Sequence, residues 1–135
     1  MVQRVTSGAV SVDGEEISSI GVGMVVLLGV THGDSSSQAR RMADKLRKLR
    51  IFEDESGRMN EALGDREVLC ISQFTLYADT SSGNRPGFKD AAPGEVAEPL
   101  YEEVCEHLEA KRGVFGADMK VDITGDGPVT ITLEV

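Results

Sequence analysis

Polar and apolar residues alternate near the start of the chain, around a turn dipeptide. Four β-branched residues flank Asp13-Gly14: Val10, Val12, Ile17 and Ile20. An Asp-Gly pair favours a tight hairpin turn. The next apolar segment, residues 22–30, is nearly continuous, which is typical of a strand buried on both faces. The pattern therefore predicts an antiparallel hairpin followed by a central strand.

Two later segments have apolar residues at helical spacing. In the first, turn and N-cap residues at 33–37 precede Ala39, Met42, Ala43, Leu46 and Leu49. We expect this helix to end before Ile51. The second has apolar positions four apart: Val96, Leu100, Val104 and Leu108. Because Pro99 would remove an interior hydrogen bond at a cost of about 3 kcal/mol, we expect the regular helix to start near Val96 or to kink there.

The remaining segments predict strands and turns. Residues 67–71 form a short apolar run of the kind that lies inside a sheet. Residues 53–65 contain glycines and scattered charges, which indicates a hairpin or loop. Two closing strands are expected at residues 119–123 and 129–133. We therefore expect one mixed α/β domain over residues 1–135, with two principal helices on a largely antiparallel or barrel-like sheet.

The composition is that of an ordinary soluble globular protein. Of 135 residues, 40% are hydrophobic and 27% are charged, and a chain of this size buries roughly two-thirds of its unfolded surface. No apolar run approaches the roughly 18 residues of a membrane span. Because the first residues lack the apolar stretch of a secretory signal, we expect a cytoplasmic location. Cys70 and Cys105 are expected as reduced thiols in or near the core.

No motif indicates a metal or a cofactor. His32 and His107 lie far apart in the sequence, without a nearby Cys or carboxylate motif, which weighs against a metal site. No Ser-His-Asp arrangement with a nucleophile elbow is visible either. We therefore expect the chain to use neither a metal nor a cofactor.

Charge is distributed unevenly along the chain. The formal net charge of -9 weighs against a nucleic-acid partner, because phosphate contacts supply much of the affinity for nucleic acids. Basic residues nevertheless concentrate in one segment: Arg40, Arg41, Lys45, Arg47, Lys48 and Arg50. Acidic residues are dense between residues 95 and 109. The basic segment is either a solvated helix face or a footprint for RNA.

Residues 71–79 hold the groups best suited to chemistry. In this segment the polar side chains of Ser72, Gln73 and Thr75 are interspersed with the apolar or aromatic side chains of Phe74, Leu76 and Tyr77. A strand end of this kind suits the floor of a pocket, although a half-buried structural strand has the same composition. The polar, Gly-rich loop at residues 80–87 follows, and its Arg85 either meets a phosphate or pairs with a nearby acid.

Several motifs resemble those of the D-aminoacyl-tRNA deacylases, in the same order along the chain. The first is Ser72-Gln73-Phe74-Thr75-Leu76, followed by Tyr77-Ala78-Asp79 and Gly83-Asn84-Arg85-Pro86. The second is Asp126-Gly127-Pro128-Val129-Thr130, where the family has Asn-Gly-Pro-Val-Thr. Family-like segments also stand at residues 3–5, 49–54 and 115–119. The resemblance therefore covers nearly the whole chain.

The resemblance implies an activity and two partners. Members of this family hydrolyse the ester that joins a D-amino acid, or glycine, to the terminal adenosine of tRNA. This is chiral proofreading in translation, and its substrates are expected to include glycine mischarged on tRNA-Ala. Because the family works as homodimers, we expect aminoacyl-tRNA and a second copy of the chain as partners, with pockets at a two-fold interface.

The resemblance also assigns residues. The family's catalytic positions are occupied by Ser72, Gln73, Phe74 and Thr75. In the family, a Gly-Pro pair with a cis peptide bond reaches into the other subunit's pocket and rejects L side chains. The corresponding substrate-binding positions are Gly127 and Pro128, with Arg4 holding the motif, and Met119. The resemblance also favours RNA as the partner of the basic segment, so the expected tRNA contacts are Arg40, Arg41, Lys45, Arg47 and Lys48, with Arg85 nearer the pocket.

The expected mechanism uses the backbone. No general base stands close to Thr75 in the sequence, so a nucleophilic threonine of the triad kind has little support. We expect the N–H groups of Phe74 and Thr75 to act as oxyanion donors, with the ribose 2′-hydroxyl of the substrate helping to activate a water.

Two departures from the family pattern keep other functions open. Only four residues separate Ala110 from Phe115, so the edge strand that follows the helix in the family is expected to be missing or rudimentary. Asp126 replaces an asparagine; both support tight turns, although a charge there would weaken RNA binding. The alternatives are a non-catalytic dimeric module that binds RNA or a ligand, and an esterase of small esters.

Overall fold

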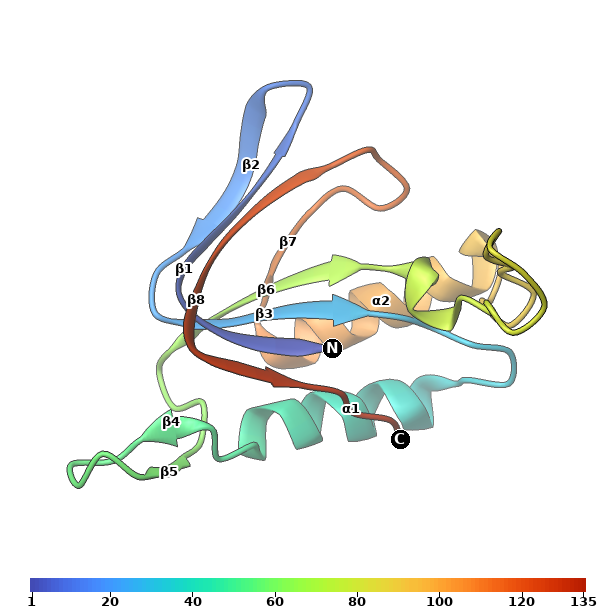
Figure 1. The fold of residues 1–135 in the computed structure, drawn as a ribbon. Helices are drawn as coiled ribbons and strands as arrows, with labels where there is room; N and C mark the ends of the chain where they lie inside the picture. Colours follow the sequence, from blue (N-terminus) through green and yellow to red (C-terminus); the bar gives the residue numbers. More distant parts are fainter.

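The computed structural model describes all residues, 1–135, as eight strands, two α-helices and one short 3-10 turn (Figure 1). Six strands form one mixed sheet in the order β2-β1-β3-β6-β7, with β8 paired to β1. Their bounds are Val2–Val12 (β1), Glu15–Ile20 (β2), Gly23–Leu28 (β3), Glu67–Ser72 (β6), Lys111–Arg112 (β7) and Lys120–Ile131 (β8). The other two, β4 (Phe52–Glu53) and β5 (Met59–Glu61), pair as a separate hairpin.

The sheet curls into a nearly closed, barrel-like shape. β1 pairs antiparallel with β2, β3 and β8, whereas β6 pairs parallel with β3 and β7. Side-chain bonds join the two ends of the sheet: Ser18 Oγ donates to the Arg112 carbonyl at 2.5 Å, and Lys111 Nζ donates to the Ser19 carbonyl at 2.7 Å. The predicted mixed α/β fold is confirmed.

The first hairpin and the central strand follow the sequence prediction. Asp13 and Gly14 have φ values of 51° and 78°, and positive φ at both central residues is what a type I′ turn needs to match the strand twist. β3 lies between β1 and β6, and five of its six residues are buried.

Two helices cover one face of the sheet: α1 (Ser36–Lys48) and α2 (Gly94–Leu108) (Figure 1). Ser35 caps α1 in a capping box with Gln38, which satisfies backbone donors at the helix start. The main core lies between the sheet and the helices and contains Val26 of β3, Leu46 of α1 and Val104 of α2. Neither helix is long and apolar enough to cross a membrane.

A second, smaller core fills the inside of the curled sheet. It contains Val25 of β3 and Leu69 of β6, with Val121 packed against it from β8. Because side chains alternate across a strand, Val25 points into the barrel while Val26 points to the helices. Both cysteines are buried free thiols, as predicted.

The second helix starts earlier than predicted. It begins at Gly94, and the N–H groups of Val96 and Ala97 both donate to the Pro93 carbonyl at 2.9 Å. Pro99 therefore lies in the helix interior. The bond that it cannot make would use the carbonyl of Glu95, and both residues are exposed, so water can satisfy that carbonyl.

The prediction of two closing strands is also wrong, because β8 is one continuous strand of 12 residues. A bulge in β8 interrupts its pairing with β1. Gln3 opposes Thr130, but Val5 opposes Gly125, so an advance of two residues along β1 corresponds to five residues along β8. The surplus residues of β8 form the bulge, which contains Asp126, Gly127 and Pro128. The short edge strand β7, only two residues long, is rudimentary, as expected.

Candidate active site

The residues at the end of β6 form a 3-10 turn rather than the predicted strand. β6 ends at Ser72, and the turn η1 spans Phe74–Tyr77. Pairing with β3 ends when the Gln73 N–H donates to the Leu28 carbonyl at 2.8 Å, after which the Leu76 N–H donates to the Gln73 carbonyl at 3.3 Å. The chain thus folds back on itself at the sheet's edge.

This turn leaves two backbone donors without partners inside it. The first N–H groups of a helical turn have no acceptor within the turn, and here these belong to Phe74 and Thr75. Both residues are exposed. Their N–H groups are therefore available to an outside oxygen, as the sequence prediction requires.

The turn borders a cavity of about 550 Å³ that includes most of the predicted catalytic set. Ser72, Gln73 and Phe74 line it at the end of β6, and Met119 lines it from the segment before β8. Residues that follow β3, that begin α2 and that form the 115–117 segment also line it: Val30, Gly94, Ala97, Phe115, Gly116 and Ala117.

The Thr75 hydroxyl lies outside this cavity and has no base beside it. Its side-chain partner is Gln73, whose amide donates to the Thr75 hydroxyl. A nucleophilic hydroxyl needs a base that removes its proton, and an amide nitrogen cannot do this. The structure therefore gives no support to a threonine nucleophile.

Phe88 is a cavity residue that the sequence analysis missed. It packs edge-on against Phe74, with ring centroids 5.1 Å apart and an interplanar angle of 73°. Both rings line the cavity, yet Phe74 is 55% exposed and Phe88 38% exposed. Apolar rings left open to solvent at a cavity mouth indicate a binding surface. No local pattern marked Phe88, because it follows a loop without periodicity.

Phe88 is held in place by the chain on both sides of it. The N–H groups of Asp79 and Gly87 donate to each other's carbonyls at 2.7 and 2.8 Å. Beyond Phe88, the Ala92 N–H donates to the Val30 carbonyl at 2.9 Å. Hydrogen bonds from Ser81, helped by nearby Lys89, lower the pKa of the Asp79 carboxyl. This base of the loop is therefore rigidly attached to β3 and η1.

The bulge in β8 is organised around Arg4, the only charged side chain that is buried, at 5% exposure. Arg4 Nη1 donates to the Ile51 carbonyl at 2.8 Å, and Nε donates to the Asp126 carbonyl at 3.2 Å. Nε also lies 3.2 Å from Asp126 Oδ2, and Nη2 lies 3.8 Å from Glu53 Oε1. Arg4 thereby fixes the residue directly before Gly127.

Gly127 has no room for a side chain. The Gly127-Pro128 peptide bond is cis, as the family resemblance implied, and Gly127 has a φ of 123°. A methyl group on Gly127 would lie 2.9 Å from Val129 Cγ2 and 3.2 Å from Arg4 Nη2. The backbone at this point is bare, and its position depends on the buried guanidinium.

The structure does not bring the two predicted sets together within one chain. Arg4, Gly127 and Pro128 are absent from the cavity lining, whereas Met119 belongs to it. Arg85 lies at the exposed tip of the 80–90 loop and pairs with no acid. Of the predicted tRNA contacts on α1, Arg40 pairs with Glu103 of α2 at 3.5 Å, and Arg47 donates to the His107 carbonyl.

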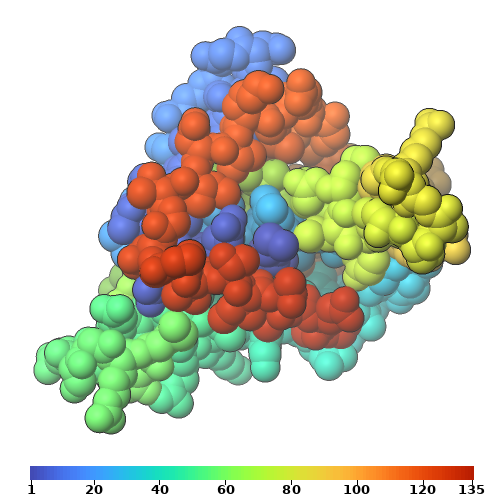
Figure 2. Space-filling model, in the orientation of Figure 1, coloured from blue at the N-terminus to red at the C-terminus, as the bar shows by residue number.

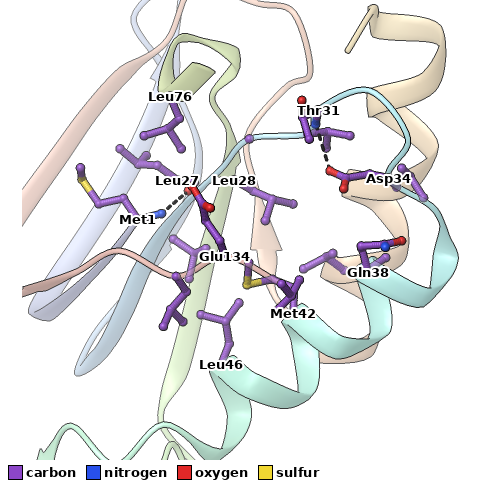
Figure 3. A pocket seen from close by; sticks show the side chains of 18 of the residues that line it. Met1, Leu27, Leu28, Thr31, Asp34, Gln38, Met42, Leu46, Leu76 and Glu134 are labelled. Carbon is purple, nitrogen blue, oxygen red and sulfur yellow. Dashed lines mark hydrogen bonds between the residues drawn. The ribbon is translucent and has the colours of Figure 1, made fainter. Parts of the chain in front are cut away.

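A second cavity, of about 440 Å³, lies on the other side of η1 (Figure 3). Leu76 and Tyr77 line it from the turn, with Leu28 of β3 and Met42 of α1. The Met1 ammonium donates to the Leu27 carbonyl at 2.9 Å at its edge. In the space-filling view the first residues lie between the C-terminal segment, in red, and the region that follows β6, in yellow-green (Figure 2). The turn η1 therefore separates two cavities.

Comparisons with known proteins find relatives along almost the whole chain. The family model described as D-Tyr-tRNA(Tyr) deacylase matches residues 1–134. The D-aminoacyl-tRNA deacylase of Anaeromyxobacter dehalogenans is 52% identical over 141 residues, covering 99% of this chain and 95% of that protein. The D-aminoacyl-tRNA deacylase of Chlorobaculum parvum is 49% identical over 142 residues, with the same coverage of 99% and 95%.

Two solved structures share the fold. One, described as a c-Myc DNA unwinding element binding protein, superposes with a TM-score of 0.93 at 45% identity, covering 99% of this chain and 96% of that one. A probable eukaryotic D-amino acid tRNA deacylase gives a TM-score of 0.81 at 15% identity, covering 94% and 93%; this second match bears on the fold alone. The family model and the curated relatives both span essentially the whole chain, and the chain therefore belongs to the D-Tyr-tRNA(Tyr) deacylase family.

Proposed function

We propose that this chain hydrolyses the ester bond of D-aminoacyl-tRNA, releasing tRNA and the free D-amino acid, as a proofreading step in translation. The observation that carries the proposal is the pair of unpartnered N–H groups at Phe74 and Thr75, beside a cavity lined by Ser72, Gln73 and Phe74. Full-length family membership supports it. A cytoplasmic location belongs to the same proposal, because translation takes place there.

In the proposed reaction, water attacks the ester carbonyl and the two N–H groups bind the oxyanion that forms. Collapse of this intermediate breaks the bond to the ribose 3′-oxygen, which leaves with a proton. The neighbouring 2′-hydroxyl of the substrate passes the proton from the water. Each oxyanion donor of this kind contributes about 3 to 4 kcal/mol to lowering the barrier, so positioning and backbone donors suffice for a reactive ester.

The cavity suits the terminal adenosine of the tRNA. Its volume of about 550 Å³ lies within the usual range for small-ligand sites. The exposed rings of Phe74 and Phe88 offer surfaces for a base, and base–aromatic stacking contributes roughly 1 to 3 kcal/mol. Met119 completes the wall on the side towards β8.

We further propose that a complete site needs two copies of the chain, arranged with two-fold symmetry. The β8 bulge presents bare backbone at Gly127, held by Arg4, but this backbone lies outside the cavity of its own chain. In a two-fold dimer, each bulge meets the other subunit's cavity. Backbone carbonyls there grip the substrate's amino group and exclude an L side chain, while glycine, which has no side chain, is also accepted.

Deacylation assays separate this proposal from the other functions. The expected result is rapid release of D-amino acids and glycine from tRNA, slow release of L-amino acids, and little turnover of a free amino-acid ester without tRNA. Equal turnover of the free ester would indicate a small-ester esterase. Binding of D-aminoacyl-tRNA without any turnover would indicate a non-catalytic binding module.

A further inference from the structure

The basic side chains that form no ion pair are concentrated in one segment, in and just after α1. Of the 14 Lys and Arg residues, six form ion pairs: Arg4, Arg40, Arg66, Lys89, Lys111 and Arg112. Five of the remaining eight lie between residues 41 and 50. Although the chain has a formal charge of -9, residues 41–50 hold five cations and one anion, Asp44.

The basic residues of α1 divide into two sets with different surroundings. Arg40 and Arg47 are seven residues apart and reach α2, through Glu103 and the His107 carbonyl. Arg41 and Lys48 are also seven residues apart, but neither forms an ion pair or a side-chain hydrogen bond, although both are exposed. Each solvated cation thus directly follows a cation that contacts α2: Arg41 follows Arg40, and Lys48 follows Arg47.

Lys45 extends the second set, which we call the outward ladder: Arg41, Lys45 and Lys48. Residues three and four apart are neighbours on a helix surface, so the three cations form one row. Their Cα atoms rise about 6 Å and then 4.5 Å along the axis. Like charges at this spacing slightly destabilise a helix. Asp44, three residues from Arg41 and four from Lys48, offsets part of this cost but forms an ion pair with neither cation.

We propose that the outward ladder of α1 binds the phosphate backbone of the tRNA substrate. The inference rests on the proposed deacylase activity and deepens it, because it separates three phosphate contacts from the two basic residues that only join α1 to α2. A row of cations spaced by one helical turn fits a polyanion with regularly repeated phosphates. Phosphate contacts position a nucleic acid without reading its sequence, so the ladder serves any tRNA that carries the right ester.

The chain offers a matched pair of variants to test this. Arg41→Gln/Lys48→Gln and Arg40→Gln/Arg47→Gln remove the same charge from the same helix at the same spacing. We expect the first to make the negative slope of log affinity against log salt less steep by roughly 1.4 to 1.8, with an unchanged Tm. Relative to a 1 M salt reference, this corresponds to about 25- to 60-fold weaker tRNA binding at 0.1 M salt. The second is expected to lower Tm and to leave the slope unchanged.

Activity on a shorter substrate separates this inference from the activity itself. On D-aminoacyl-adenosine, which has no tRNA backbone, the Arg41→Gln/Lys48→Gln variant is expected to match the wild type in kcat and KM. A wild type inactive on every aminoacyl-tRNA would instead refute the deacylase proposal.

Other outcomes would overturn the proposal that the outward ladder binds tRNA. Equal slope changes in the two variants would show an effect of net charge alone, and no change in either would show that α1 is a solvated face. Binding of phosphatidylserine vesicles that the first variant loses, with tRNA binding intact, would assign the row to an anionic membrane.

Discussion

At the end of β6 the chain presents free backbone donors on an exposed turn, whereas in the β8 bulge a buried side chain holds the backbone from beneath. Phe74 and Thr75 are open to solvent, and their backbone N–H groups are free because of the conformation of η1. Gly127 depends on Arg4, which is 5% exposed and bonded to two other segments of the chain. Mutations should therefore act differently in the two regions: side-chain removal is damaging under the bulge and mild at the turn.

The largest effect is expected from Arg4→Met. The substitution keeps apolar bulk but leaves the Ile51 carbonyl without its donor and Asp126 without its cation. Removing one partner of a buried ion pair costs roughly 3 to 5 kcal/mol, and we expect about 3 because Asp126 is partly exposed. Chemical denaturation measures this loss. Lys89→Met, which breaks only an exposed pair with Asp79, is the control and should cost less than about 1 kcal/mol.

Gly127→Ala should come next. At a φ of 123° an alanine is strained, by roughly 1 to 3 kcal/mol, and its methyl group would also press on Arg4 and Val129. We expect kcat/KM for D-aminoacyl-tRNA to fall at least tenfold. Gly57→Ala is the matched control, because Gly57 also has a positive φ of 75° but nothing within 4 Å of the added methyl. It should lose some stability and no activity; equal activity losses would contradict a special role for the bulge.

Phe88→Leu tests the support of the turn and should have an intermediate effect. Leucine keeps most of the apolar contact but loses the edge-to-face arrangement with Phe74, which contributes about 0.5 to 1.5 kcal/mol beyond burial. We expect a three- to tenfold rise in KM for D-aminoacyl-adenosine, as measured by single-turnover and steady-state assays. Normal kinetics in this variant would show that Phe88 does not take part in binding.

The smallest effect is expected from Thr75→Ala. The backbone N–H remains, and the lost hydroxyl has only the Gln73 amide as its side-chain partner. We expect kcat within about threefold of wild type, because backbone donors do not depend on the side chain. A folded Thr75→Ala enzyme without turnover would restore the threonine nucleophile and overturn the proposed mechanism.

The sequence predicted the elements whose causes are local. The Asp13-Gly14 turn formed as expected, and the N-cap of α1 lies within the predicted segment 33–37, since backbone conformation and capping depend on a few neighbouring residues. The end of β6 was assigned wrongly, because Phe74, Thr75 and Tyr77 all favour strands. The turn forms because Gln73 makes the last bond to β3 and the chain then has no partner strand, which only the tertiary structure decides.

The candidate site also contains both residues that the sequence could locate and residues that only the tertiary structure reveals. The motif residues at 72–75 could be located from the sequence, since they form one string. Phe88 could not, because its contact with Phe74 depends on a loop attached through Asp79 and Ala92. The partner set of Arg4 also joins segments that lie about 50 and 120 residues apart. Contacts of this kind carry no periodic signal.

The most direct test of the central claim is subunit complementation. Gly127→Ala damages the bulge, and Ala117→Trp fills the cavity at a partly exposed position. The two variants are purified separately, then unfolded together and refolded as a mixture. If the bulge and cavity of different chains complete each site, half of the dimers formed by random pairing are mixed, and each has one intact site out of two.

The account predicts that the mixture recovers about a quarter of the wild-type activity on D-aminoacyl-tRNA, while each variant refolded alone keeps about a tenth of it or less. A mixture no more active than the two variants measured separately would show that each chain completes its own site, and would contradict the account.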